Sequence, residues 1–381
     1  MRTKVVIIGG GPSGLLLSRL LSLENIDNMV LEKQTREHVQ GRIRAGVLEN
    51  GTIDILRLAG VSNRLDSEGF KHNGIELSFK NHGFRIDLKK LTDKHVTVYG
   101  QTEVTKDLYE IIEKENCNII NSAEDVLPQN IGKNNSFVTF KKNGIEKKIT
   151  CDFIVGCDGY HGISRKVIPD NLTNIFERVY PFGWLGILSE TPPVKEELIY
   201  ANHGNGFALA SMRNQNLSRY YIQTSLGDNI EDWSDKRFWE ELKRRLPIEA
   251  SETIITGPSI EKSIAPLRSF VCEPMNWNNL FLVGDAAHIV PPTGAKGLNL
   301  AVSDVYYLLG DNEDLENYST KALSRVWKAI RFSWWMTTTF HKFPEQTSFD
   351  QRIQDSELEY LENSIASQTV LAENYVGLPY E

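Results

Sequence analysis

Few cysteines and no long apolar run occur in this sequence, and both shortages narrow the kind of protein it can encode. Four cysteines among 381 residues lack the spacing of a metal site: Cys117, Cys151, Cys157 and Cys272. We therefore expect free, mostly buried thiols, a cytoplasmic protein and no bound metal. No run of about 18 apolar residues exists, so no membrane-spanning helix is predicted. An apolar run near the N-terminus is broken by glycines after Ile8, which argues against a signal peptide.

An excess of positive charge is also missing. The chain holds 42 lysines and arginines against 50 aspartates and glutamates, and its formal net charge is −8. Nucleic acids and anionic membranes select basic patches, so we expect neither as a partner, although a small anion can still bind a local arginine. The length exceeds the roughly 250–300 residues that a single core usually serves, so more than one subdomain is expected.

Short apolar segments that end in glycine are present instead, and they indicate an α/β fold. Val5–Ile8 is typical of a central parallel strand, Pro12–Leu23 of a helix and Met29–Glu32 of a second strand, which together make a βαβ opening. Cys151–Val155 is a later strand of the same kind. Between about 180 and 270 the pattern alternates between apolar and polar residues, which favours an inserted antiparallel sheet that binds the substrate.

From about residue 296 the sequence pattern becomes helical. Five apolar residues recur at helical spacing, and we expect this stripe to pack within the protein and in part against a second subunit. The stripe consists of Leu323, Val326, Trp327, Ile330 and Trp334. Asn134-Asn135 and Lys141-Lys142-Asn143-Gly144 are typical of hairpin turns.

A glycine fingerprint follows the first predicted strand. Gly9, Gly11 and Gly14 form Gly-x-Gly-x-x-Gly between a strand and a helix. The first glycine makes a tight turn, the second lets a pyrophosphate approach the backbone, and the third lets helix and strand pack closely. Glu32 ends the next strand 21 residues after Gly11, where a carboxylate can accept hydrogen bonds from ribose hydroxyls. The fingerprint predicts dinucleotide binding but does not separate FAD from NAD.

Two further motifs favour FAD. Segments 156–165 and 284–299 each follow an apolar strand, and they carry Asp158 and Asp285. Asp285 at a strand end can accept hydrogen bonds from a polyol, and the glycines after it open a helix whose N–H groups can face a ring carbonyl. Each segment alone could be an ordinary strand-to-helix turn, whereas all three motifs in order in one chain are far more specific.

This order of motifs resembles that of the group A flavoprotein aromatic hydroxylases, and within them the hydroxylases of 4-hydroxybenzoate, over nearly the whole chain. The segments that carry the resemblance are 41–49, 98–105, 176–184, 294–297 and 372–381. The chain departs from the family in a shortening around Leu308–Glu316, which concerns surface contacts rather than chemistry.

The resemblance implies an FAD-dependent monooxygenase that uses NADPH or NADH and O2, through a flavin C4a-hydroperoxide, to convert 4-hydroxybenzoate into 3,4-dihydroxybenzoate. The expected fold is α/β: a Rossmann-like FAD-binding domain at 1–175 with residues near 72–97 on the substrate side, a substrate-binding β-sheet domain at 176–284, and a flavin-contacting, helical interface domain at 285–381. A homodimer through the helical part is expected. Two alternatives stay open: a hydroxylase of a related acid such as 3-hydroxy- or 4-aminobenzoate, and a flavoprotein that senses without hydroxylating.

The resemblance also implies which residues contact FAD. Arg42 and Arg44 suit phosphate in their own right, because arginine can bind it through two donors, although a solvated turn would also explain them. Lys296 and Asn299 would lie near the flavin and stabilise negative charge on it, whereas His288 is expected to be structural. The full set is Gly9, Gly11, Ser13, Gly14, Glu32, Arg42, Ile43, Arg44, Ala45, Gly46, Val47, Gln101, Asp158, Asp285, Lys296, Leu298 and Asn299.

A candidate carboxylate receptor lies on two neighbouring predicted strands. One strand carries Ser211, Met212 and Arg213, and the other carries Tyr221. An arginine flanked by hydroxyls suits a carboxylate, because its fork pairs with both oxygens and the hydroxyls complete them. Taken alone, Arg213 would also fit a surface salt bridge; the resemblance makes it the anchor of the substrate carboxylate.

The phenol proton of the substrate poses a chemical problem, because the phenolate ring is far more electron-rich than the phenol. A tyrosine with a pKa near 10 is not a strong base by itself. The resemblance implies a proton path from Tyr200 through Tyr375 and water to His72, which we expect to titrate near neutral pH. Ordinary core packing would also explain both tyrosines. Pro292 would place its carbonyl near the substrate hydroxyl.

Only one Gly-x-Gly-x-x-Gly occurs, so the nicotinamide cofactor must bind transiently across the surface. The resemblance implies His161 and Arg268 as its contacts. Lys33 and Arg36 could pair with a 2′-phosphate whereas Glu37 would repel it, so we favour NADPH and leave NADH open.

Overall fold

The computed structural model describes residues 1–41, 46–115, 117–133, 135–310 and 315–380. Its first sheet has the strand order β18-β19-β12-β1-β2-β8. These strands are β1 (Val5–Ile8), β2 (Asn28–Leu31), β8 (Asn118–Ile120), β12 (Phe153–Gly156), β18 (Asn276–Trp277) and β19 (Leu280–Leu282). The run from β19 to β8 is parallel. All of β1 is buried, as expected for a parallel strand covered on both faces, and the predicted βαβ opening is confirmed.

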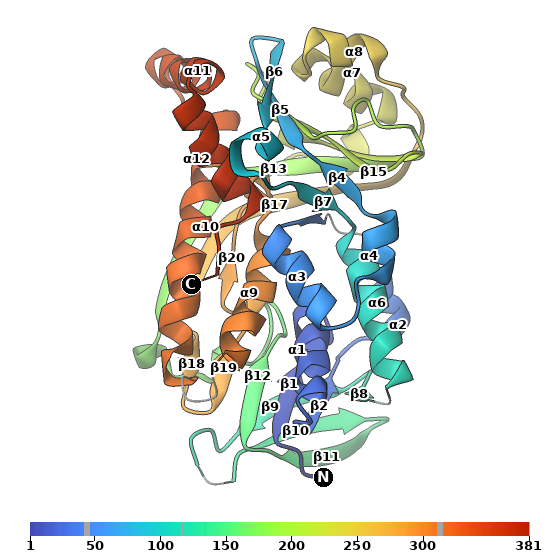
Figure 1. The fold of residues 1–381 in the computed structure, drawn as a ribbon, viewed down its shortest axis with the longest axis vertical. Helices are drawn as coiled ribbons and strands as arrows, with labels where there is room; N and C mark the ends of the chain where they lie inside the picture. The colour runs from blue at the N-terminus through green and yellow to red at the C-terminus, as the bar shows by residue number, and fades with distance from the viewer. Residues whose placement is uncertain (42–45, 116, 134, 311–314, 381) are drawn as a thin grey trace.

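Helices cover this sheet (Figure 1). α1 packs on α6 and α9, and α3 packs on α9. The helices of this half are α1 (Pro12–Leu23), α2 (Arg36–Gln40), α3 (Asn50–Leu58), α4 (Asn63–Glu68), α6 (Gln101–Lys114) and α9 (Gly297–Leu309). Two small sheets flank them: β3 (Val47–Leu48), β7 (Val96–Val98) and β4 (Phe70–His72), and β9 (Glu124–Gln129), β10 (Phe137–Lys142) and β11 (Ile145–Thr150).

The predicted turn between β10 and β11 is confirmed. Asn143 and Gly144 alone connect the two antiparallel strands, with φ angles of 54° and 75°. Two successive residues with positive φ make the turn whose twist matches a hairpin, and Asn-Gly is its preferred sequence. Asn134, in the other predicted turn, lies outside the described residues.

An eight-stranded sheet crosses the upper half of the molecule in Figure 1, in the order β20-β17-β13-β16-β15-β14-β5-β6. Its strands are β5 (Gly74–Phe79), β6 (His82–Asp87), β13 (Asn174–Ser189), β14 (Ile199–Ala201), β15 (Ala208–Asn214), β16 (Leu217–Thr224), β17 (Ser259–Glu273) and β20 (His288–Ile289). All neighbours are antiparallel except β14 and β5. The predicted antiparallel sheet is therefore present.

The two faces of this sheet have different partners. Alternate residues such as Ala210, Tyr220 and Ile222 form a core with α7 (Asp235–Arg245) and α8 (Ile248–Thr253). The other face carries Tyr200, Leu209 and Trp184, and it packs against the C-terminal helices. Those helices, with the short α5 beside them, are α5 (Leu88–Thr92), α10 (Tyr318–Phe340), α11 (Ser348–Asn363) and α12 (Ile365–Val376). The face toward α10 and α12 is where the candidate substrate residues gather.

The strand pairing does not follow the sequential domain boundaries drawn from the sequence. Residues 276–282, which we had assigned to the substrate domain, pair in the first sheet as β18 and β19. The substrate sheet takes β5 and β6 from the N-terminal half and β20 from beyond residue 284. Pairing between distant segments sets the limits of each sheet, and no local change of composition marks them.

The predicted stripe on α10 divides into two parts. Val326 and Ile330 are buried in the main core, whereas Trp327 and Trp334 are 38% and 41% exposed. Three of the four free cysteines are buried, as expected. Among the described helices, none combines the length and apolar character that crossing a bilayer requires.

Candidate active site

The glycine fingerprint forms a tight turn between β1 and α1. Gly9 has a φ of 111°, and a Cβ there would lie 2.3 Å from the Cys157 carbonyl oxygen. A Cβ at Gly14 would lie 2.0 Å from the Gly9 oxygen, whereas one at Gly11 would meet no described atom within 4 Å. α1 starts with Gly11 as its N-cap and shows neither a side-chain cap nor a first-turn acid. Its N–H groups and positive end therefore fit a pyrophosphate.

Glu32 is organised by the same turn. Its carboxylate accepts the Gly10 N–H at 2.6 Å and the Gln34 N–H at 2.7 Å, one on each oxygen. A carboxylate has about four acceptor sites, so these bonds orient Glu32 and leave capacity for ribose hydroxyls. The arrangement fits the predicted contact with the adenosine side of FAD.

Asp158 holds its own loop together. One of its carboxylate oxygens accepts both the N–H and the hydroxyl of Ser164 at 2.9 Å. Its other oxygen is buried and has no hydrogen-bond partner within the described chain, and burial raises the pKa of this carboxyl. Asp285 is half-buried at the end of β19, where a short 3₁₀ turn begins. Both acids are thus held at strand ends beside the glycine turn.

The remaining predicted FAD contacts lie near Gly46, in α1 and α9, and outside the described residues. Gln101 and Val47 are half-buried beside Gly46, where no side chain fits because a Cβ would lie 1.9 Å from the Tyr99 oxygen. Ser13 is buried in α1, and Leu298 is half-buried in α9. The predicted residues Arg42, Ile43, Arg44 and Ala45 lie outside the described residues.

Lys296 and Asn299 bind protein groups at the start of α9. Lys296 Nζ donates to Glu49 Oε1 at 2.6 Å and to the Tyr375 carbonyl oxygen at 3.1 Å. Asn299 accepts from Glu49 N and the Thr52 hydroxyl. Its amide nitrogen donates to the carbonyls of residues 47 and 295. Asn299 therefore ties the segment 47–52 to the start of α9, and its proposed role beside the flavin remains a prediction.

The predicted substrate residues Tyr200, Ser211 and Tyr221 lie on one face of the large sheet. Tyr200 on β14 pairs with Leu209 on β15, and Leu209 pairs with Tyr221 on β16. Ser211 is two residues beyond Leu209 and therefore shares its face. Met212 alternates to the opposite face, so its predicted contact with substrate is limited to its backbone; its carbonyl accepts from Arg213 Nη1 at 3.3 Å.

Arg213 is partly buried without an acidic partner in the described chain. Its Nη1 donates to Ser211 Oγ at 3.0 Å, and its buried Nε has no hydrogen-bond partner among the described residues. Burial lowers the pKa of this guanidinium, the neighbouring Arg219 adds to the effect, and the Tyr221 side chain opposes it. A buried cation with an unused donor suits an anion that arrives with the substrate.

The two predicted relay tyrosines meet although 175 residues separate them. Tyr200 and Tyr375 are 1% and 2% exposed, and their hydroxyl oxygens are 2.8 Å apart. Burial raises the pKa of both hydroxyls above the usual value near 10. Both tyrosines are therefore protonated at neutral pH, and the pair can pass a proton only by giving one and taking another.

His72 on β4 is buried, and neither ring nitrogen has a hydrogen-bond partner within the described residues. Burial lowers the pKa of its imidazole to about 4. We expected titration near neutral pH, which is wrong for this buried position because desolvation disfavours the charged ring. The unpaired ring nitrogens still suit a water-mediated contact.

Pro292 opens a 3₁₀ turn, Pro292–Gly294, that packs against α10. Its carbonyl accepts the Ala295 N–H at 2.9 Å, and Ala295 has a φ of 54°. His288, by contrast, is buried and bonded to Asp304 Oδ2 at 2.7 Å. Asp304 also accepts the Gly284 N–H, so this pair holds the turn after β19.

Two features of the substrate face were missed from the sequence. Arg219 lies 5.1 Å from the Tyr221 ring centroid and is paired with Glu261 at 2.9 Å. Trp184 packs on Tyr221 and donates its indole N–H to His341 Nε2 at 2.7 Å. Strand alternation could have placed Arg219 beside Tyr221, but nothing local links Trp184 to a histidine 157 residues away.

The predicted nicotinamide contacts fall into two groups. Arg268 pairs with Glu177 at 2.9 Å and lies 4.5 Å above the Tyr160 ring, which also contacts His161 edge-on. Lys33 and Arg36 lie elsewhere, after β2. Lys33 is exposed, while Arg36 Nη1 donates to both carboxylate oxygens of Glu113.

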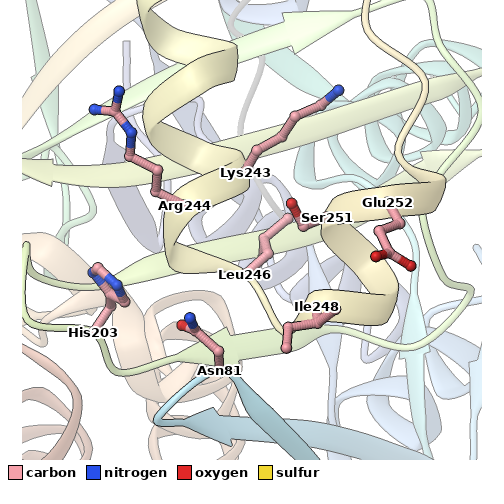
Figure 2. A pocket seen from close by; sticks show the side chains of 8 residues that line it. All are labelled: Asn81, His203, Lys243, Arg244, Leu246, Ile248, Ser251 and Glu252. Carbon is pink, nitrogen blue, oxygen red and sulfur yellow. The ribbon is translucent and has the colours of Figure 1, made fainter.

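An open hollow of about 450 Å³ lies on the far side of the large sheet (Figure 2). It is bordered by α7, α8, the β5–β6 turn and the loop after β14, and its lining residues are Asn81, His203, Lys243, Arg244, Leu246, Ile248, Ser251 and Glu252. None of the predicted site residues lines it.

The parallel sheet and the glycine turn define a nucleotide-binding α/β protein of the kind that holds FAD. The family described as FAD binding domain matches residues 2–333. The p-hydroxybenzoate hydroxylase of Acinetobacter baylyi is 54% identical, and the match covers 100% of this chain and 96% of that protein. The chain therefore belongs to the p-hydroxybenzoate hydroxylase family of the group A flavoprotein hydroxylases, which are FAD-dependent aromatic monooxygenases.

More distant relatives agree on the fold. A 3-amino-4-hydroxybenzoate 2-monooxygenase of Streptomyces cremeus is 23% identical, with 92% of this chain and 91% of that protein covered. The solved structure of p-nitrophenol 4-monooxygenase from Pseudomonas putida matches with a TM-score of 0.82 at 16% identity, over 99% of both chains. The resemblance, the fold class, the FAD cofactor and the NAD(P)H reductant inferred from the sequence are confirmed.

Proposed function

We propose that this chain hydroxylates 4-hydroxybenzoate at the carbon next to its hydroxyl group and forms 3,4-dihydroxybenzoate, with O2 and NAD(P)H as co-substrates. One observation carries the proposal: two features occur on the same sheet face. The first is Arg213, which is partly buried and has no acidic partner in the described chain. The second is the hydroxyl pair of Tyr200 and Tyr375. The 54% identity to a p-hydroxybenzoate hydroxylase supports the same substrate.

Arg213 is proposed to bind the substrate carboxylate. Its Nε is free of protein partners within the described residues, and its Nη1 lies beside Ser211 Oγ. Tyr221 completes the receptor from β16. Ser211 is two residues along β15 from the residue opposite Tyr200, a spacing of about 7 Å in an extended strand.

Tyr200 is proposed to draw the proton from the bound phenol. It accepts that proton while it donates its own to Tyr375, because neither tyrosine ionises readily at this depth. His72, with two ring nitrogens that lack partners in the described chain, is the proposed end of the path through water. The Pro292 carbonyl has a second lone pair beyond its bond to Ala295, and it is proposed to face the substrate hydroxyl.

FAD, reduced by NAD(P)H and then reacted with O2, supplies the electrophilic oxygen when it is bound. The chain is proposed to hold it through Gly9, Gly11 and Glu32 at the nucleotide end and through the start of α9 at the ring end. α9 begins at Gly297 with no side-chain cap in the described structure, so its N–H groups are available to a carbonyl.

The nicotinamide cofactor is proposed to contact His161 and Arg268 around the Tyr160 ring. NADPH is proposed over NADH on the strength of Lys33, which is exposed after β2. Arg36 contributes less than its sequence suggested, because Glu113 already neutralises it.

A homodimer and a cytoplasmic location complete the proposal. Phe176 and Val179 on β13 are 45% and 53% exposed, and Phe176 packs edge-on against the exposed Trp327 at 5.4 Å. An apolar patch of this kind, with Trp334 on the same helix, suits a contact between copies. The free cysteines support a reducing compartment.

A direct test is to incubate the FAD-loaded enzyme with NADPH, O2 and each of 4-hydroxybenzoate, 3-hydroxybenzoate and 4-aminobenzoate. Product is identified by mass and retention, and NADPH and O2 consumption are followed in parallel. We expect 3,4-dihydroxybenzoate in near-stoichiometric yield from the first acid, and reductant consumption with little product from the other two. Equal yield from 3-hydroxybenzoate or 4-aminobenzoate would refute the assignment to the para phenol.

A further inference from the structure

A buried ion cluster joins α3, α9 and α10. The Glu49 carboxylate accepts Lys296 Nζ on one oxygen at 2.6 Å and Arg325 Nη2 on the other at 2.9 Å. The three side chains are between 4% and 9% exposed. One carboxylate thus faces two basic side chains. Burial lowers the pKa of the Lys296 ammonium and Glu49 opposes that effect; with both basic groups protonated, the cluster carries one positive charge in excess.

Arg325 also binds the chain that follows Tyr375. Its Nη1 donates to the carbonyls of Leu378 at 2.7 Å and Pro379 at 3.2 Å, and its guanidinium lies 4.5 Å from the Tyr380 ring centroid. Gly377 has a φ of 98°, and a Cβ there would lie 2.2 Å from Glu49 Oε2. The segment 377–380 therefore lies against the ion cluster, where the Arg325 guanidinium binds two of its carbonyls, and the Tyr380 ring also stacks on Tyr306 at 4.7 Å.

The cluster touches the tyrosine pair through Lys296. Lys296 Nζ donates to the Tyr375 carbonyl oxygen at 3.1 Å and lies 5.9 Å from the Tyr375 ring centroid. The Tyr375 hydroxyl meets Tyr200 at 2.8 Å. A continuous series of contacts thus connects Arg325 to the proposed proton path.

We propose that Arg325 is a positioning residue for the hydroxylation: it fixes Glu49 and segment 377–380 together, and so sets both the place of Tyr375 and the positive excess beside the tyrosine pair. The inference rests on the proposed function, because it assigns Arg325 to the phenol proton path. The planar guanidinium serves a carboxylate and two carbonyls from donors in fixed directions, a geometry that a lysine ammonium does not reproduce.

Arg325 could act through its positive charge or through the geometry of its hydrogen bonds, and two substitutions separate these contributions. Arg325→Gln removes the charge and most of the fork, and Arg325→Lys keeps the charge without the fork. A cavity of about 20 Å³ borders Glu49, Lys296 and Arg325, and it has room for a water beside a shortened side chain. The matched control is Arg331→Lys, on the same helix, which loses a bond from Arg331 Nη2 to Asn374 Oδ1 on α12 but does not reach Glu49.

Three readouts are taken on the FAD-loaded enzymes: the pH at which bound 4-hydroxybenzoate ionises, followed by the absorbance of its phenolate; kcat and KM for product formation; and hydrogen exchange of the amides of residues 376–378 and 380. Arg325→Gln is expected to raise the phenol pKa by about one unit, as for removal of one charge on the order of 10 Å away at an effective dielectric constant of about 20. Its kcat should fall about tenfold with KM changed less than about threefold, and the tail amides should exchange faster.

Arg325→Lys should keep the phenol pKa within about 0.3 unit of the wild type while its tail amides still exchange faster, and Arg331→Lys should match the wild type in all three readouts. If the glutamine variant does not fold, the lysine variant carries the test alone. An unchanged phenol pKa in a folded Arg325→Gln enzyme overturns the electrostatic part, and wild-type tail exchange in both variants overturns the positioning part. If the wild type does not hydroxylate 4-hydroxybenzoate, the proposed function fails, but tail exchange still reports on the clamp.

Discussion

Replacing Arg213 by glutamine is expected to weaken binding of 4-hydroxybenzoate by about 10- to 150-fold, because a charge-assisted hydrogen bond contributes about 1.5–3 kcal/mol. The upper part of that range is favoured by the structure. Arg213 Nε is buried and has no partner within the described chain, and Nη1 is held by Ser211, so the fork is already oriented before substrate arrives. Little side-chain freedom is left to lose on binding.

The assay is a titration of the FAD-loaded enzyme at pH 7 with 4-hydroxybenzoate and with 4-hydroxybenzamide, which has nearly the same shape and no charge. Wild type should prefer the acid, and Arg213→Gln should lose that preference while it binds the amide about as well as before. This cycle isolates the charge interaction from packing. Acid binding within about threefold of the wild type in Arg213→Gln would show that the carboxylate is bound elsewhere, and the same loss for acid and amide would indicate a collapsed site.

Three further predictions concern other parts of the molecule. Tyr200→Phe should slow product formation by about 100-fold or more, the range for loss of a proton-transfer group; a full rate, measured as product per enzyme per second, would contradict the proton path. Glu113→Gln should release Arg36 and raise the NADPH-to-NADH ratio of kcat/KM by about threefold, as expected for an exposed ion pair. A ratio unchanged in stopped assays would remove Arg36 from cofactor selection. His72 and His341, with pKa values lowered to about 4 and about 3, remain neutral when folded but take protons below about pH 6.5 when unfolded. The free energy of unfolding should therefore fall as pH drops from about 6.5 to about 4, by up to about 2.7 kcal/mol per pH unit for the two protons. Urea unfolding of the wild type and of His341→Gln should show a shallower pH dependence in the variant.

The sequence predicted those parts of the fold whose signals are local. The strand Val5–Ile8, the glycine turn and the Asn143-Gly144 hairpin each depend on a few adjacent residues, and all are present. The limits of the two sheets were not predictable in this way. Strand β5 joins β14 across more than a hundred residues, and no local pattern encodes such a pairing.

In the candidate site, too, the local signals were predictable and the long-range contacts were not. Residue types suited to an anion and a phenol were visible at Arg213, Tyr221 and Tyr200, and a resemblance paired Tyr200 with Tyr375. The ion cluster that lies beside Tyr375 could not be predicted, because Glu49 and Arg325 lie 276 residues apart and resemble surface charges in the sequence. Burial also reversed one expectation: His72 carries a typical neutral-pH side chain in the sequence, yet desolvation lowers its pKa to about 4.

The lowered pKa of His72 changes how the proposed proton path would operate. A histidine with a pKa near 4 holds almost no proton at pH 7, so it cannot store the phenol proton and must pass it on to water. The tyrosines cannot store it either, because burial raises their pKa values. Every described member of the path is therefore neutral at rest, and the phenolate itself is the ionised group. Its charge must be stabilised by its surroundings rather than by a base, and the Lys296–Glu49–Arg325 cluster, which touches Tyr375 through Lys296, is a proposed source of that stabilisation.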